Sequence, residues 1–347
     1  MKKNKYFVHP LLGLLLVLQG YIAIAQNKKT ERSCPFVFEL HKKGGTQKLR
    51  YASNHFLTTV DTSVKTLLVY IHGINRNGED YFEYGERMLR ATNKKKETLL
   101  IAPQYANAED LDYYQLGNDF LYWKKAEWKD GHTSISSDNR PQSLKISSYE
   151  VLDSLLTAVL SSGKFPNIQR VIVCGHSAGG QFVQRYSAIT PVPDRFTQYK
   201  FRFLVMDPSS YMYLDGRRPL ADKTFGVPDT SGCPEYNNYP KGLLKLNTYA
   251  NTIGAENIKR NVMQRDIVIL LGEKDTRTDD PNLDVTCSGN LQGRFRLERG
   301  LNYVSYLSCF PGYTHKGNYN VVAGSGHNGD TMINSDEAKK WIFDEGN

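Results

Sequence analysis

Short apolar runs alternate with amphipathic, helix-like segments along most of this chain. The first two runs, "CPFVFEL" and "QKLRYASNHF", predict an opening pair of antiparallel strands. Further buried strands are predicted at "KTLLVYIHG", "ETLLIAPQY", "RVIVCGH", "YKFRFLVMDPSS", "RDIVILLGEKD" and "YNVVAGSG". Helical periodicity lies between them, over residues 80–93, 143–160, 293–307 and 335–343 and directly after residue 177. This alternation predicts an α/β fold with a mostly parallel sheet covered by helices on both faces.

Two long irregular segments interrupt the alternation. Residues 106–141 follow one predicted strand and residues 211–264 follow another, and both are rich in aromatic and turn-forming residues. Parallel strands end at the same edge of a sheet, and α/β proteins bind their ligands at that edge. We therefore expect both segments to lie above the ligand-binding edge, the second as a cap-like insertion.

The first 25 residues have the pattern of a signal peptide. Three lysines precede an apolar core at residues 11–18, and "AIA" at residues 23–25 resembles a cleavage site. Cleavage near Ala25/Gln26 would leave residues 26–347 as one α/β domain, secreted or periplasmic. The apolar core is short for a membrane span, and no second stretch of spanning length follows, so no stable membrane span is expected.

The stretch "VIVCGHSAGGQFVQRY" carries the strongest chemical signal. Its "GHSAG", residues 175–179, fits the pattern G-x-S-x-G, in which a serine occupies a strained turn between a strand and a helix. Small neighbours let the backbone approach closely, so the hydroxyl is held out above the sheet. The β-branched residues before the motif and the helix-compatible residues after it provide the context that the motif requires. Ser177 is therefore predicted to be a nucleophile rather than a serine in a structural turn.

A serine nucleophile requires a base to take its proton, and the chain has eight histidines. His327 is the favoured base because "VVAGSGHNGD" places it in a glycine-rich loop directly after the last predicted strand. His315, which precedes that strand, is the alternative. The side chain of His176, next to the serine, is expected to point away from the base.

The base must in turn be oriented by a carboxylate. Asp275 follows the strand "RDIVILLG" and lies between Ser177 and His327 in the sequence. Asp207, in "FLVMDPSS", occupies the corresponding end of the preceding strand and is the alternative acid. Asp275 is favoured because an acid after the later strand suits the order Ser, Asp, His.

Negative charge that develops on the substrate oxygen needs two backbone N–H groups directed at it. One is expected from Ala178, the residue after the nucleophile. The other is expected from Ile74, because "HGIN" after the strand "LLVYI" turns the chain at a glycine and presents the next amide. Together these two amides form the predicted oxyanion hole.

These motifs resemble those of the α/β-hydrolase superfamily, and specifically its secreted serine esterases and lipase-like members. The resemblance covers about residues 65–345 in order: an HG oxyanion loop, a GHSAG elbow, an acid after a late strand and a late histidine. It implies an eight-stranded, mostly parallel sheet with a cap inserted between the sixth strand and the acid. The oxyanion loop reads HGIN rather than the HGGG of hormone-sensitive-lipase-like enzymes, and the insertion at 211–264 matches no cap of assigned substrate.

Three further groups of residues have ordinary structural interpretations. Five aromatic residues in the first irregular segment are expected to pack that segment onto the sheet, with substrate stacking as the alternative: Tyr105, Tyr113, Tyr114, Trp123 and Trp128. An acidic loop is expected to be solvated rather than to bind calcium: Asp279, Asp280 and Asp284. Charged residues on a late helix are expected to form a surface ion-pair set: Arg294, Arg296, Glu298 and Arg299.

Cysteine and charge content limit the chain's compartment and partners. Cys174 lies in an apolar strand and is expected to be a buried free thiol, and the four remaining cysteines allow three disulfide pairings: Cys34, Cys233, Cys287 and Cys309. The formal net charge is +8, and removal of the leader takes away three lysines and lowers it to +5. The basic residues are scattered rather than clustered, so nucleic acid is not an expected partner.

The sequence therefore predicts a secreted serine hydrolase that cleaves a small-molecule or polymeric carboxylic ester without a cofactor or metal ion. Ser177 would form an acyl-enzyme that water hydrolyses. A peptidase or acyltransferase of the same fold is one alternative, and a non-catalytic glycan- or polymer-binding protein on a hydrolase scaffold is another. Acyl and alcohol specificity and oligomeric state depend on surfaces that these patterns do not describe.

Overall fold

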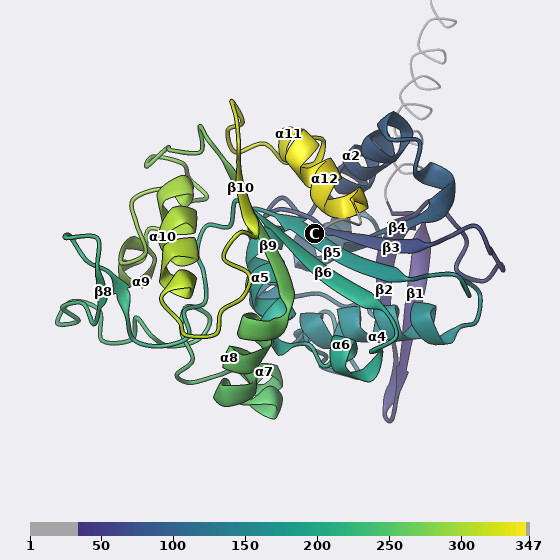
Figure 1. The fold of residues 1–347 in the computed structure, drawn as a ribbon. Coiled ribbons are helices and arrows are strands. Elements are labelled where there is room, and N and C mark those ends of the chain that lie inside the picture. Colours follow the sequence, from purple (N-terminus) through teal and green to yellow (C-terminus); the bar gives the residue numbers. More distant parts are fainter. Residues whose placement is uncertain (1–33, 345–347) are drawn as a thin grey trace, which may run out of the picture.

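One eight-stranded sheet forms the centre of the computed structural model, which describes residues 34–344 (Figure 1). The predicted signal peptide lies outside these residues. The strands are β1 (Phe36–Lys42), β2 (Gly45–Ser53), β3 (Thr66–Ile71), β4 (Thr98–Gln104), β5 (Arg170–His176), β6 (Lys200–Met206), β9 (Asp266–Gly272) and β10 (Tyr319–Val322). Their order is β1-β2-β4-β3-β5-β6-β9-β10. The pairs β1–β2 and β2–β4 are antiparallel and the others parallel, which confirms the predicted mostly parallel sheet.

Alternate residues of the strands contribute to two separate hydrophobic cores, one on each face of the sheet. In β3, Val69 and Ile71 belong to one core, whereas Leu68 and Tyr70 belong to the other. Helices α4 (Ser148–Ser161) and α5 (Ala178–Ile189) cover the first face, and α2 (Gly78–Ala91) and α12 (Asp336–Phe343) cover the second (Figure 1). Helices on both faces are thus confirmed.

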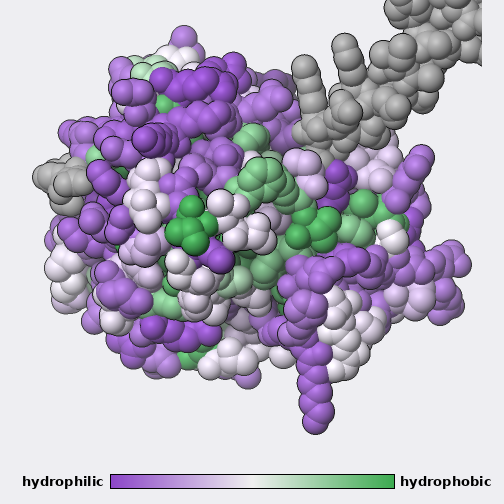
Figure 2. Space-filling view, turned by 90° about the vertical axis from the view of Figure 1, so that its right-hand side faces the viewer, coloured by the Kyte–Doolittle hydropathy of each residue, from purple (hydrophilic) through white to green (hydrophobic). Residues whose placement is uncertain are grey.

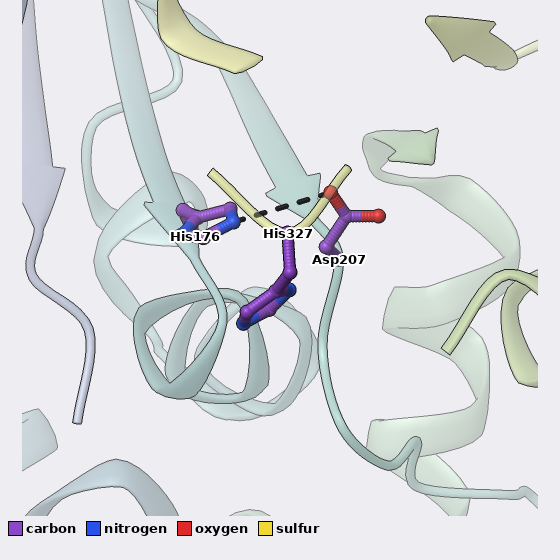
Figure 3. A group of neighbouring side chains, drawn as sticks. All are labelled: His176, Asp207 and His327. Atoms are coloured by element: carbon purple, nitrogen blue, oxygen red, sulfur yellow. Dashed lines mark ion pairs between the residues drawn. The ribbon is translucent and has the colours of Figure 1, made fainter. Parts of the chain in front are cut away.

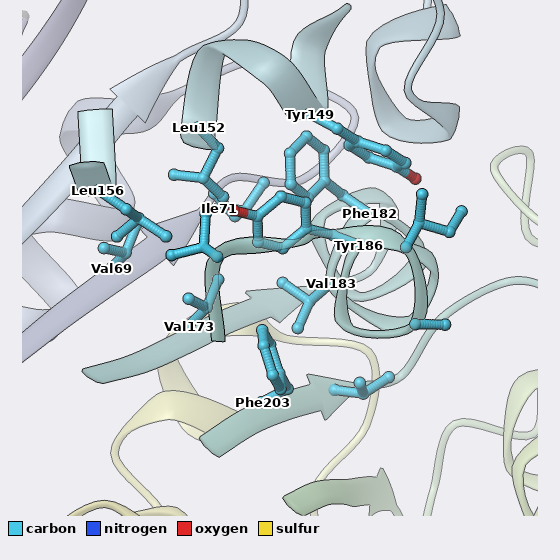
Figure 4. Close-up of a cluster of buried hydrophobic side chains, with 14 of the residues drawn as sticks. Val69, Ile71, Tyr149, Leu152, Leu156, Val173, Phe182, Val183, Tyr186 and Phe203 are labelled. Carbon is cyan, nitrogen blue, oxygen red and sulfur yellow. The ribbon is translucent and has the colours of Figure 1, made fainter. Parts of the chain in front are cut away.

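Aromatic packing fixes α5, the helix that follows the GHSAG motif. Figure 4 shows Phe182 and Tyr186 of α5 beside Tyr149 of α4, and every residue of α5 is buried. The rings of Tyr149 and Phe182 meet edge to face with their centroids 4.7 Å apart. Such pairs add about 0.5–1.5 kcal/mol beyond the burial of their area. The helix is therefore held rigidly under the strand ends.

The predicted helices are present, with shifted starts where capping residues act. The helix expected from residue 143 begins at Ser148, because the Ser147 side chain accepts a hydrogen bond from the Tyr149 N–H and caps it. The helix expected over 293–307 is α10 (Arg296–Ser308). Shorter helices that the patterns did not resolve are η1 (Lys95–Glu97), α3 (Ala108–Tyr113), η2 (Glu127–Asp130), α6 (Val192–Arg195), α9 (Cys287–Asn290) and α11 (Gly329–Ile333).

The segment over residues 211–264 has two parts. Its first part contains a small hairpin of β7 (Arg218–Pro219) and β8 (Phe225–Gly226). Its second part contains α7 (Thr248–Ile253) and α8 (Ala255–Gln264). Helix α8 packs against α5, where the Asn261 side-chain amide donates to the Ala188 carbonyl at 2.8 Å. The end of the segment thus belongs to the helical layer below the sheet.

Two of the five cysteines form a disulfide, between Cys233 and Cys287. Cys174 is a buried free thiol, as predicted. The other two candidates, Cys34 and Cys309, do not pair. Cys34 is buried beside Gln104, while Cys309 is exposed at the end of α10, and β1 and α10 lie on opposite sides of the molecule (Figure 1).

The side of the molecule that carries β1 and β2 is largely hydrophilic, with hydrophobic residues gathered in a band across its middle (Figure 2). Within residues 34–344, no helix combines the length and the apolar character that crossing a membrane requires.

Candidate active site

Ser177 lies in the sharp turn between β5 and α5. Its backbone has φ 59° and ψ −118°, a conformation that costs an ordinary side chain on the order of 1–3 kcal/mol. Close backbone contacts explain the neighbouring glycines: a Cβ would lie 2.2 Å from the Gly179 oxygen if placed on Gly175, and 2.1 Å from the Ile71 oxygen if placed on Gly179. Gly180, outside the motif, is equally confined, with Met206 O 2.4 Å from its missing Cβ.

The structure brings Ser177, His327 and Asp275 into one chain of hydrogen bonds. His327 lies in the loop between β10 and α11, and its Nε2 is 2.9 Å from Ser177 Oγ. Its Nδ1 is 2.7 Å from Asp275 Oδ2, in the loop after β9. The serine hydroxyl donates to Nε2 when Nδ1–H donates to the carboxylate, which is the arrangement in which the imidazole accepts the serine proton. Ser177 is 7% and Asp275 2% exposed, so the chain is shielded from bulk water.

The two alternative residues do not join this chain. His315 lies near the Gln264 carbonyl, with Nε2 3.3 Å from that oxygen. Asp207 is fully buried at the end of β6, where its Oδ1 accepts a hydrogen bond from the Gly272 N–H at 2.8 Å. Asp207 therefore holds the ends of β6 and β9 together.

His176 and Asp207 form a second pair beside His327 (Figure 3). Their side chains point toward one another from the ends of β5 and β6, with His176 Nε2 3.9 Å from Asp207 Oδ2. Burial lowers the pKa of His176 well below its usual range. Burial and the nearby Asp275 raise the pKa of Asp207 well above its usual range, so burial favours the uncharged form of both groups.

The prediction that His176 points away from the base is wrong. Its ring packs against the ring of His327, with centroids 4.6 Å apart. The ring takes this position because its Nδ1 bonds with the Tyr81 hydroxyl of α2, 3.1 Å away, while the His327 loop lies against its face.

The donor atoms of this cluster do not suit a metal ion. His176, Asp207 and His327 offer ligand atoms within 4.8 Å of one another. Both nitrogens of His327 are already engaged, however, one by Ser177 and the other by Asp275. A metal would have to displace the hydrogen bonds that orient the imidazole.

The acidic loop after β9 also lacks a shared metal site. Its carboxylates each have a separate basic partner: Asp279 pairs with Arg277, Asp280 with Arg296, and Asp284 with Lys241. Ion pairing rather than simple solvation is what occupies them.

The two predicted oxyanion amides lie on adjoining backbone segments. Ala178 is the first residue of α5, and the next residue, Gly179, touches the end of β3 just before the loop that contains Ile74. Within residues 34–344, neither the Ile74 nor the Ala178 N–H donates a hydrogen bond to another residue. Both amides are thus free for a ligand near the positive end of α5.

His72 supports the loop that contains Ile74, a role that the sequence analysis missed. Its Nε2 accepts from the Tyr105 N–H at 2.9 Å, and its Nδ1 donates to the Gly73 carbonyl at 2.9 Å. Burial lowers the pKa of His72 to about 4, so the ring stays neutral. Trp128 packs edge to face on this ring at 4.6 Å and stacks on Tyr105 at 5.6 Å.

Packing, rather than exposure to a substrate, accounts for most of the aromatic residues in the first irregular segment. Tyr105, Trp123 and Trp128 are fully buried, which confirms the packing interpretation for them. Tyr113 is 66% exposed and contacts the ring of Tyr114.

The prediction of a surface ion-pair set on α10 is wrong for two of its members. Arg296 and Arg299 are fully buried, because α10 packs against β9 on the face that carries them. A signal was present in the sequence: Arg296, Arg299, Tyr303 and Tyr306 recur at helical spacing on one face. Arg296 Nη1 lies 3.5 Å from Asp275 Oδ1, which makes it a neighbour of the candidate site.

Solved structures share this architecture. A poly(aspartic acid) hydrolase from Sphingomonas sp. KT-1 is 21% identical and matches over 90% of this chain and 99% of its own, with a TM-score of 0.58. LpqC, a poly(3-hydroxybutyrate) depolymerase from Bordetella parapertussis, is 18% identical and matches over 88% and 89%, also with a TM-score of 0.58. No protein-family model and no curated protein sequence matches the chain. The likeness and the strand order identify the α/β-hydrolase fold, as the sequence motifs implied.

Proposed function

We propose that this protein is a serine hydrolase that cleaves carboxylic esters through an acyl-enzyme on Ser177. The observation that supports this proposal is the continuous hydrogen-bond chain from Ser177 through His327 to the buried Asp275. A serine with a base at hydrogen-bond distance, and a base oriented by a carboxylate, is the arrangement that activates a hydroxyl for attack.

The proposed reaction has two halves. Ser177 Oγ attacks the acyl carbon while His327 Nε2 takes the hydroxyl proton, and Asp275 stabilises the imidazolium that forms. The Ile74 and Ala178 amides donate to the oxygen of the tetrahedral intermediate. This oxygen carries more negative charge than the carbonyl oxygen of the substrate, so the hydrogen bonds to it are stronger. His327 then gives the proton to the departing alkoxide, and the acyl-enzyme remains. Water, deprotonated by His327, attacks the acyl carbon, and the proton returns to Ser177 as the acid leaves.

The substrate class that we propose is a small-molecule or polymeric ester. The two solved structures described above are named for the hydrolysis of polymers. One of these polymers is the polyester poly(3-hydroxybutyrate). A polyester therefore belongs in the test panel beside simple esters. The catalytic parts described above need no cofactor, and no step requires one.

We also propose that the mature protein is exported, with residues 26–347 as one domain and residues 211–264 as a cap-like insertion whose last part, α7 and α8, packs in the helical layer. The disulfide between Cys233 and Cys287 supports export, because such bonds persist in oxidising compartments. Cys233 lies in the insertion and Cys287 beyond β9, so the bond ties the insertion to the domain.

A fluorophosphonate probe tests the nucleophile without knowledge of the substrate. We expect mature protein to be labelled at Ser177 and to hydrolyse p-nitrophenyl acetate, butyrate, octanoate or palmitate, or poly(3-hydroxybutyrate). Ser177→Ala should lower turnover at least about 10³-fold and abolish labelling. Ser187→Ala removes another buried serine of α5 and serves as the control, because the Ser187 hydroxyl donates to the Gln184 carbonyl of its own helix. Equal activity in wild type and Ser177→Ala would eliminate this mechanism.

A further inference from the structure

Arg296 lies in the protein interior, directly behind the proposed catalytic acid. Its side chain is fully buried at the first residue of α10. Nη1 is 3.5 Å from Asp275 Oδ1, and Nη2 is 3.2 Å from Asp280 Oδ1. Asp275 uses its other oxygen for His327. The guanidinium thus extends the chain of Ser177, His327 and Asp275 by one more group.

The main chain fixes the same geometry. The Leu297 N–H donates to the Asp275 carbonyl at 3.2 Å, so the first turn of α10 is bonded to the acid's own backbone. The Asp275 N–H in turn donates to the Gly272 carbonyl at the end of β9. The start of α10, the acid loop and the strand end therefore form one unit that sets where the carboxylate points.

We infer that Arg296 is a positioning residue for this site: it holds Asp275 in the orientation that accepts from His327. The inference rests on the proposed function. The planar guanidinium directs one donor to each of two carboxylates, Asp275 and Asp280. A buried carboxylate that lost its positive partner would rotate or take up a proton.

Few of the ionisable groups around His327 carry charge at neutral pH. Burial lowers the pKa of one group and raises the pKa of three others, which favours the uncharged form of each: His176 from β5, Asp207 from β6, Tyr211 after β6 and Tyr81 from α2. Glu273 and Lys274 are exposed and screened by solvent. Asp275 and Arg296 are buried and Asp280 is partly buried beside them, while the partly buried Asp330 pairs with Arg87.

The charge of Arg296 should affect the pH dependence of the reaction at Ser177. Removing Arg296 takes a positive charge from the vicinity of His327 and leaves Asp275 with more negative potential. Both changes favour proton uptake by the His327–Asp275 pair, and a protonated His327 is not a base. The acid-side midpoint of the rate profile should therefore move to higher pH. Removing Asp280, on the other side of Arg296, should move it to lower pH.

The test measures fluorophosphonate labelling of Ser177 from pH 4 to 9 on mature protein. For Arg296→Gln we expect the maximal inactivation rate constant to fall about 10- to 100-fold, the range for a hydrogen bond to a charged group, with probe affinity little changed. Its acid-side midpoint should rise by about one pH unit. Arg296→Lys should keep the midpoint near the wild-type value, because it keeps the charge. Asp280→Asn should lower the midpoint.

Arg299→Gln is the matched control. Arg299 is equally buried one turn along α10 but bonds to Gly293, Ser209 and Asn290 rather than to the triad. It should lose stability while keeping the wild-type midpoint. If Arg296→Gln does not fold, the lowered midpoint expected for Asp280→Asn decides. Wild-type midpoints in every folded variant would overturn the inference. Failure of the wild type to label at Ser177 would instead overturn the proposed function, and this inference with it.

Discussion

At the residue scale, Asp207 and Asp275 follow neighbouring strands but have different partners. Asp275 contacts the imidazole of His327 and the guanidinium of Arg296. Asp207 accepts one backbone N–H, and burial raises its pKa well above the usual range, which favours its neutral form. A neutral carboxylic acid cannot stabilise an imidazolium by charge, so the environment rather than the residue type separates the two.

This difference predicts opposite outcomes for two equivalent substitutions. Asp275→Asn should lower kcat/KM by about 10³- to 10⁴-fold, because the amide offers His327 no negative charge and favours the wrong tautomer. Asp207→Asn should keep most activity, since an amide resembles the neutral acid in shape and polarity. Steady-state kinetics on a p-nitrophenyl ester give both numbers, and a reversed pattern would assign the acid to the end of β6.

At the scale of elements, the contact between α5 and β3 brings the proposed nucleophile and the candidate oxyanion amides onto adjoining segments. Gly179 allows this contact, because any Cβ there would overlap the Ile71 carbonyl. A displacement of α5 would also disturb the packing of Phe182 against Tyr149. The glycine of the motif is therefore a requirement of packing as much as of the turn.

Gly179→Ala should push α5 away from β3. Overpacking of this kind costs about 1–3 kcal/mol of unfolding free energy. Labelling of Ser177 should fall at least about 10-fold, because removal of one oxyanion donor alone has a larger effect and the shift displaces both donors in part. Urea unfolding and fluorophosphonate labelling measure the two effects. Gly317→Ala is the control, since no atom lies within 4 Å of its added Cβ. Equal stability and equal labelling of the two variants would contradict the packing argument.

At the scale of the whole molecule, buried neutral histidines connect the site to acid stability. The pKa of His72 is lowered by burial to about 4, whereas an unfolded histidine titrates near about 6.5. As the pH falls below about 6.5, the unfolded chain takes up the proton first, and the native state loses relative stability until about pH 4. His176, whose pKa burial also lowers, acts in the same direction.

We therefore expect the free energy of unfolding to fall between about pH 6.5 and pH 4, with His72 alone contributing on the order of 3 kcal/mol. Urea unfolding at pH 7, 6, 5 and 4.5 measures this slope. His72→Gln should be less stable at pH 7 but show a flatter dependence on pH. His41→Gln, at an exposed position, should keep the wild-type slope. A wild-type slope in His72→Gln would show that its proton uptake is not linked to folding.

The sequence by itself determined the features that depend on neighbouring residues. Apolar alternation specified the strands, helical spacing specified the long helices, and the GHSAG motif located a strained serine between them. The order of strands and motifs also predicted the fold, because parallel strand ends meet at one edge. Ser177, Asp275 and His327 could be selected on this basis as residues that end near that edge.

Only the tertiary structure decided which groups meet across that edge. Arg296 and Arg299 were interpreted as surface residues, and burial of α10 against β9 was needed to place them inside. The pairing of Cys233 with Cys287 and the packing of His176 on His327 likewise join residues far apart in the chain. Local sequence patterns determine which residues form each helix or strand. The partners of a buried side chain, and therefore its charge state, depend on elements that are distant in the sequence and pack against it.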